Sequence, residues 1–110
     1  MQLYTIRRRS AWRSHDELEA AAERSKQVGE EMAAQIRWIR SYVVAEDDGK
    51  LGSVCVYQAT SKEAILHHAA RAGFRTDEIA RVADTVVARP DPDPQRHPGV
   101  AARSDSEANG

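Results

Sequence analysis

The fold of this chain is decided by residues 38–73, which read WIRSYVVAEDDGKLGSVCVYQATSKEAILHHAARAG. Two runs rich in β-branched and aromatic residues, Ile36–Ala45 and Leu51–Ala59, stand on either side of Asp48-Gly49. This dipeptide is a preferred pair for a two-residue turn between antiparallel strands. The segment therefore predicts a β-hairpin.

A helix is expected directly after the hairpin. Thr60 and Glu63 have the spacing of a capping box, in which two side chains satisfy the free N–H groups at a helix start. Gly73 suits the left-handed backbone conformation that often follows the last helical residue. The sequence thus predicts a helix that is capped by Thr60 and runs through Ala72.

Three further elements are predicted on the two sides of this segment. Residues 3–9 alternate between apolar and polar side chains, which is typical of a strand. Ser14 and Glu17 form another capping box, which predicts a helix to about residue 32. A last strand is expected over 79–87. The order βαββαβ predicts an α+β, ferredoxin-like sandwich, in which a four-stranded antiparallel sheet carries two helices on one face.

Composition predicts one globular domain followed by a tail. The chain has 110 residues, of which 41% are hydrophobic and 30% charged. All four prolines lie in 89–110, where the other residues are small or polar, so this tail is expected to be disordered. The ferredoxin-like domain then covers 1–88. A domain of this size has a small core, and we expect it to form a homodimer.

Charge, hydropathy and cysteine content limit the class and location of the protein. The net charge of -1 gives little support for nucleic-acid binding, and no apolar run is long enough to span a membrane. A single cysteine forms no intrachain disulfide, and no secretion signal is present, so a cytoplasmic location is expected. The local basic cluster is interpreted as a solvated strand end: Arg7, Arg8, Arg9 and Arg13.

The turn also predicts which side chains share a face of the hairpin. With a two-residue loop, Tyr42 lies opposite Cys55. The face without helices then carries aromatic rings, a guanidinium and a thiol, and we expect a dimer interface or, alternatively, a ligand pocket there: Trp38, Arg40, Tyr42, Cys55 and Tyr57. The opposite face carries aliphatic side chains such as Val54 and Val56 and is assigned to the core.

Several segments carry a family resemblance: WIRSYV, the Gly-Lys turn, CVYQA and HAARAG. They resemble a small bacterial family that is described as nickel-binding or as a domain of unknown function. The resemblance extends from residue 3 to the last strand. It implies a dimeric ferredoxin-like fold and the binding of nickel or another divalent transition metal, and it brings no enzymatic activity with it.

Histidines are the preferred candidates for such a metal, because imidazole binds late first-row divalent ions well. His68 is the first candidate and His67 the second. His68 also lies on the apolar stripe of its helix, so a core histidine bonded to a neighbour such as Ser41 is the competing interpretation. His67 stands four residues after Glu63, and this pair suits a surface ion. Two protein donors rarely hold a metal tightly, so water or a second subunit must complete the site. The predicted faces separate Cys55 from His68.

Three other functions are open at this stage. RNA binding is disfavoured, because Gly52 and Val54 stand where an RNA recognition motif has stacking aromatics. A structural or regulatory dimer needs only the aromatic face. A small-molecule-binding protein that resembles cofactor-free monooxygenases is the main alternative, with His68 as general base and with three further pocket residues: Trp38, Tyr42 and Tyr57.

Overall fold

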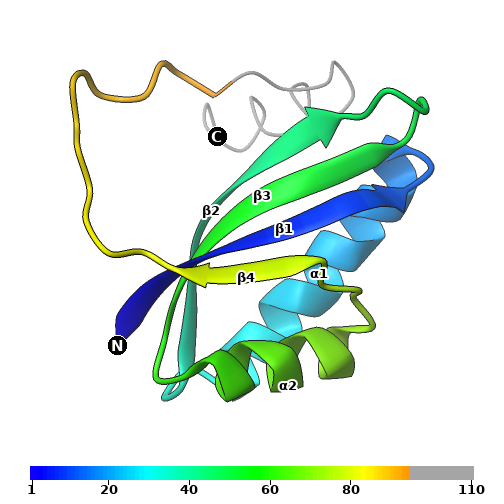
Figure 1. The fold of residues 1–110 in the computed structure, drawn as a ribbon. Coiled ribbons are helices and arrows are strands. Elements are labelled where there is room, and N and C mark those ends of the chain that lie inside the picture. Colours follow the sequence, from blue (N-terminus) through cyan, green and yellow to red (C-terminus); the bar gives the residue numbers. More distant parts are fainter. Residues whose placement is uncertain (95–110) are drawn as a thin grey trace, which may run out of the picture.

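A computed structural model describes residues 1–94 of the protein. Six elements follow one another in the predicted order, as Figure 1 shows. They are β1 (Gln2–Trp12), α1 (His15–Glu31), β2 (Ile36–Ala45), β3 (Leu51–Ala59), α2 (Lys62–Ala72) and β4 (Glu78–Arg81). The predicted α+β, ferredoxin-like fold is confirmed.

The strands form a single antiparallel sheet in the order β2-β3-β1-β4. Both helices lie on the same side of this sheet (Figure 1). We call this side the helix face and the other side, which neither helix covers, the open face. β2 is one edge of the sheet, so its outer backbone groups pair with no other strand of residues 1–94. No helix in this part of the chain is long and apolar enough to cross a membrane.

Side-chain caps begin both helices. The hydroxyl of Ser14 accepts a hydrogen bond from the backbone N–H three residues on, at 3.3 Å, as predicted for α1. The cap predicted for α2 is wrong by one residue, because Ser61, not Thr60, accepts the N–H of Ala64. Thr60 still belongs to the end of the sheet, where its own N–H donates to the carbonyl of Gln35.

The hairpin turn has one residue more than predicted. The N–H of Glu46 donates to the carbonyl of Lys50, and the N–H of Gly49 donates to the carbonyl of Glu46, so the loop is 47–49. Gly49 has φ +83°, the left-handed conformation that the last position of a three-residue hairpin loop favours. The additional loop residue moves the pairing of the two strands by one position.

This shift exchanges the faces that were predicted for β3. Tyr42 lies opposite Val54 and Ser41 lies opposite Cys55, so the predicted register is wrong. Because side chains alternate along a strand, a shift of one residue reverses which set is buried. The buried residues of the helix face in β3 are Ser53, Cys55, Tyr57 and Ala59. Val54 and Val56 lie on the open face and are not part of the core, contrary to prediction.

A β-bulge at Ile39 divides β2. Trp38 pairs with Tyr57, whereas Arg40 pairs with Val56, so Ile39 has no position of its own in the ladder. Trp38 is therefore on the helix face and Arg40 is on the open face. The aromatic face predicted from the sequence does not exist as one surface, because Trp38, Cys55 and Tyr57 lie on one side of the sheet and Arg40 and Tyr42 on the other.

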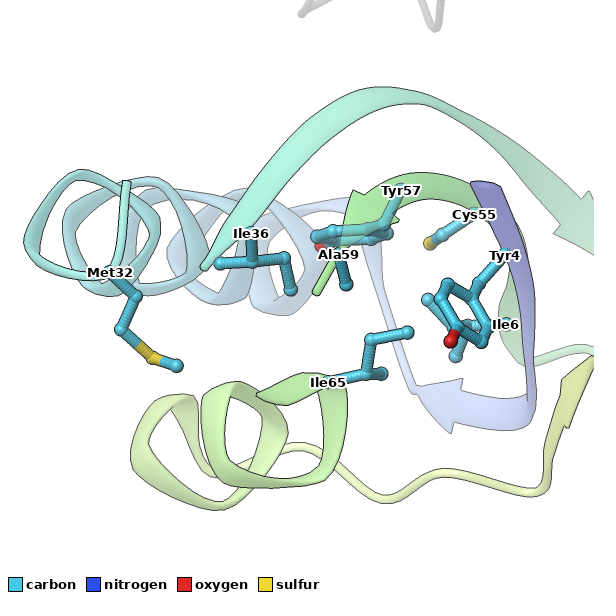
Figure 2. Close-up of a cluster of buried hydrophobic side chains, with 8 residues drawn as sticks. All are labelled: Tyr4, Ile6, Met32, Ile36, Cys55, Tyr57, Ala59 and Ile65. Carbon is cyan, nitrogen blue, oxygen red and sulfur yellow. The ribbon is translucent and has the colours of Figure 1, made fainter. Parts of the chain in front are cut away.

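The hydrophobic core lies between the helix face and the two helices. In Figure 2, Ile65 of α2 points toward the strands, and Met32 closes the end of the cluster next to Ile36. Ile6 and Ile65 are almost completely buried. The cluster consists of Tyr4, Ile6, Met32, Ile36, Cys55, Tyr57, Ala59 and Ile65. α2 is thus fixed to the sheet by aliphatic contacts and aromatic rings.

The last strand is shorter than the predicted 79–87. β4 pairs with β1, and one further hydrogen bond runs from the N–H of Val82 to the carbonyl of Leu3. β1 itself begins at Gln2, which lies opposite residue 83 in this register, so residues 84–87 have no residue of β1 opposite them. The length of the partner strand thus limits β4, although two further apolar residues follow at Val86 and Val87.

Part of the predicted tail is described. Residues 83–94 form no helix or strand. The carboxylate of Asp91 contacts both the guanidinium of Arg40 and the hydroxyl of Tyr42, which brings this segment back to β2. Residues 95–110, the rest of the predicted disordered tail, lie outside the described part of the chain.

Candidate functional site

His68 lies where α1, α2 and the sheet meet. Its side chain is 1% exposed, and its Nε2 is 3.1 Å from the carbonyl oxygen of Ser25 on α1. A carbonyl oxygen only accepts, so Nε2 carries the proton and Nδ1 keeps the free lone pair. His68 therefore occupies the position of a core histidine, and its partner is Ser25 where Ser41 was expected.

Tyr57 packs against His68 from the sheet. The centroids of the two rings are 5.6 Å apart in an edge-to-face arrangement, and the Tyr57 hydroxyl is 3.2 Å from Oγ of Ser25. Trp38 stacks nearly parallel to Tyr57 at a centroid distance of 6.1 Å. Burial raises the pKa of Tyr57, which keeps its hydroxyl protonated. A contiguous row of three rings therefore joins the edge strand β2 to α2.

The burial of His68 predicts a pH-dependent stability. Burial, the largest cause, lowers the pKa of His68 below its ordinary value of 6.5. Above about pH 6.5 the side chain is neutral in both the folded and the unfolded chain, and its contribution is fully present. Below this pH, His68 binds a proton in the unfolded chain but stays neutral in the folded chain. We therefore expect the free energy of unfolding to fall between pH 7 and 5.

Urea denaturation at several pH values measures this effect, with H68Q as the reference. Glutamine retains an N–H donor for the carbonyl of Ser25 but does not titrate. The free energy of unfolding should fall less steeply in H68Q than in the wild type. Parallel curves between pH 7 and 5 would show that His68 does not cause the dependence.

His67 and Glu63 lie on the outer side of α2. Both side chains are exposed, and their spacing of four residues places them next to each other on the helix surface. An imidazole and a carboxylate are both suitable donors for a divalent transition metal. Among residues 1–94, no group of three or more His, Cys, Asp or Glu side chains could hold a metal ion. His67 and Glu63 are thus two neighbouring side chains with donor atoms on this surface.

The thiol of Cys55 is on the same side of the sheet as His68, so the predicted separation of these two residues is wrong. Its sulfur lies 3.4 Å from Nη1 of Arg8, 3.0 Å from Oγ of Ser41 and 3.3 Å from Oγ of Ser53. The side chain is 5% exposed. Polar protein groups thus surround the thiol, and it belongs to the interior of the domain.

Arg8 is buried, so the prediction that it belongs to a solvated strand end is wrong. It is 1% exposed, although Arg7 and Arg9 on either side reach the surface. A signal was present in the alternation of β1, where Arg8 continues the buried positions Tyr4 and Ile6. Because Arg8 is charged, the alternation was not recognised as continuing to this position.

Arg40 and Tyr42, which were expected in a dimer interface or pocket, lie on the open face next to residues 86–92. Tyr42 is 48% exposed, and Arg40 is also exposed. Together with residues 86–92 they line a hollow of about 780 Å³. The residues named for the monooxygenase-like alternative are not brought together, since Tyr42 lies on the open face whereas Trp38, Tyr57 and His68 lie on the helix side.

Comparison with known proteins gives one family and one similar structure. A family model described as nickel responsive protein SCO4226-like matches residues 4–82. The crystal structure of SCO4226 from Streptomyces coelicolor A3(2) is similar with a TM-score of 0.61 and 20% identity, over 76% of this chain and 99% of that chain. At this identity the structural likeness concerns the fold. No curated protein matches the chain.

Proposed function

We propose, from the fact that the chain belongs to the nickel responsive, SCO4226-like family, that it is a homodimeric protein that binds nickel or another divalent transition metal. The match over residues 4–82 is the observation that carries the proposal, because it includes all six elements of the fold except the first two residues of β1. The binding role is inferred from the family's description and from the donors on α2.

His67 is our leading ligand, with Glu63 beside it. Both side chains are exposed on α2, so an ion can reach them without any change in the core. His68 would have to give up its hydrogen bond to the Ser25 carbonyl and leave the interior. We therefore assign His68 the task of holding α2 against α1, which positions the neighbouring imidazole.

The number of protein donors predicts how such a site behaves. His67 and Glu63 provide two ligands, and water completes the coordination of the ion. α2 lies on the opposite side of the sheet from the open face (Figure 1). If two chains associate through their open faces, the two metal sites stay apart, so we expect one ion per chain and moderate affinity.

Calorimetric titration of the protein with nickel, cobalt and zinc tests this site. We expect H67A to weaken nickel binding by roughly tenfold or more, which corresponds to the loss of about 1.4 kcal/mol of binding free energy. E63Q should weaken nickel binding less than H67A does, because glutamine keeps an oxygen donor, although an amide oxygen is a poorer donor than a carboxylate. H15A, which removes a histidine of α1, is the matched control and should bind as the wild type does.

Two results would contradict different parts of the proposal. If none of the three ions gives heat or a thermal shift, the proposal that the protein binds a metal is wrong. Unchanged affinity in H67A, with binding in the wild type, would leave metal binding intact but move the site elsewhere. The midpoint of urea denaturation of each variant, measured without metal, shows whether the fold is retained.

The open face supports the homodimer. It carries the half-buried apolar side chains of Leu3, Val54 and Val56, and neither helix covers it. Next to them, Tyr42 is half exposed, and an aromatic ring with a polar end is common in protein interfaces. A second copy of the chain would bury this surface and enlarge a small core.

Light scattering measures the association. We expect Y42E to convert a dimer into a monomer, because the new carboxylate would be buried between the two sheets beside Asp91, which already pairs with Arg40, the nearest guanidinium. L66E is the matched control, since Leu66 is an apolar residue of similar exposure, 46%, on the helix side. L66E should remain a dimer. A dimeric Y42E protein would place the interface elsewhere.

A further inference from the structure

A buried guanidinium without a carboxylate partner distinguishes one end of the sheet. Its neighbours in β1 are paired, Arg7 with Glu46 at 2.9 Å and Arg9 with Glu78 at 3.1 Å. Arg8 is the most deeply buried of the three, yet it has no ion pair with any residue of 1–94. A buried charge is unfavourable unless an opposite charge or several hydrogen bonds compensate it.

The contacts of Arg8 compensate its charge only in part. Its Nε donates to the carbonyl oxygen of Arg75 at 3.1 Å, and its Nη1 lies 3.4 Å from the sulfur of Cys55. The guanidinium carbon stands 4.9 Å from the centre of the Phe74 ring. A guanidinium has five N–H donors, and these contacts use two of them. The group keeps donors for an anion.

A cavity of about 180 Å³ adjoins this guanidinium. Trp12 and Phe74 meet there almost perpendicularly, with their centroids 6.0 Å apart, and their rings form part of its lining. The charge of Arg75, at the rim, is already balanced by Asp77 at 2.9 Å. The unbalanced charge at the cavity is therefore the single positive charge of Arg8. The lining consists of Arg8, Ala11, Trp12, Gly73, Phe74 and Arg75.

An irregular backbone brings Trp12 to this place. The pairing of β1 with β3 jumps from Arg8 opposite Ser53 to Trp12 opposite Leu51, so two additional residues bulge out of β1. Within the bulge Ser10 has φ +48°, a left-handed conformation that costs free energy for a residue with a side chain. The bulge keeps Trp12 on the same side of the sheet as Arg8.

We propose that this cavity is a binding site for a small monocarboxylate with a flat apolar body. The carboxylate would accept hydrogen bonds from Arg8, and the body would lie against Trp12 and Phe74. The volume equals about six water molecules at roughly 30 Å³ each, which suits a benzoate-sized compound. A monoanion matches the single uncompensated charge. The proposal does not depend on metal binding.

Benzoate is the probe, and the first comparison needs no mutation. Titration of metal-free protein is followed by NMR through the indole N–H of Trp12, which W12F assigns. Benzoate should shift this signal and raise the melting temperature. Benzamide has the same shape without the charge, and it should bind roughly tenfold more weakly or worse, because the hydrogen bonds lose their charge assistance.

Variants then locate the site. R8M should abolish the response to benzoate, and R9M, which removes the neighbouring surface arginine, should retain it. If R8M does not fold, R8K and W12A serve instead: each should weaken benzoate binding at least severalfold. Equal affinity for benzoate and benzamide would overturn the proposal. So would a wild-type protein in which benzoate moves neither the indole signal nor the melting temperature.

Discussion

Replacing Gly52 by alanine is expected to lower the free energy of unfolding by about 3 kcal/mol. A Cβ atom at this position would lie 2.5 Å from the carbonyl oxygen of Arg8 and would overlap the carboxylate of Glu46. The Glu46 side chain can move away only by giving up its ion pair with Arg7. The carbonyl belongs to the paired strand and cannot move without distorting the sheet. Urea denaturation followed by circular dichroism measures the loss.

The same substitution elsewhere in the chain is the control. Gly29 lies near the end of α1, and the nearest atom to a Cβ there is Nε2 of His68 at an ordinary 3.8 Å. G29A should therefore stabilise the protein by about 0.5 kcal/mol, since alanine favours the helix more than glycine does. Equal effects of G52A and G29A would show that the close approach at Gly52 is relieved at no cost.

Replacing Tyr57 by alanine should have a larger effect, about 4 kcal/mol. The ring fills the centre of the helix face, where it contacts Trp38 and His68. Its removal leaves a cavity between the sheet and α2, and the hydroxyl of Ser25 loses its partner. In a domain with a core this small, the loss is a large part of the total stability. The melting temperature and the urea midpoint should both fall strongly.

Y57F separates the ring from its hydroxyl. Phenylalanine keeps both ring contacts and gives up the hydrogen bond to Ser25, so we expect a loss of about 1 kcal/mol. A Y57A protein as stable as Y57F would mean that the row of rings contributes little.

The melting curves of H67A should meanwhile follow those of the wild type, because His67 lies outside the core.

The elements of the fold were predictable because their signals are local. The β-branched runs, the serine cap of α1 and the glycine after α2 each act within a few residues, and Gly73 has the predicted left-handed conformation, with φ 78°. The register was not predictable to the same degree. Both two-residue and three-residue hairpin loops accept a glycine at position 49, and one additional loop residue reverses a whole face.

The candidate site was predictable in its residue types but not in its arrangement. The helix period correctly placed His68 on the inner side of α2 and His67 on the outer side. The partner of His68 is Ser25 of α1. The spacing of residues within α2 does not show which turn of α1 packs against His68. Arg8 was missed because a charged residue is seldom buried, and its burial depends on contacts with Phe74 and Arg75, far along the chain.

The bulge at Ile39 also affects how the molecule behaves among its own copies. A straight edge strand of ten residues with exposed apolar side chains is a template on which another strand can add, and such addition leads to aggregates. A bulge interrupts the regular pattern of an edge, and in β2 the exposed Arg37 adds a positive charge two residues before the bulge. The bulge at Ile39, which divides the aromatic residues between two faces, thus also disfavours the addition of further strands to the exposed edge of β2.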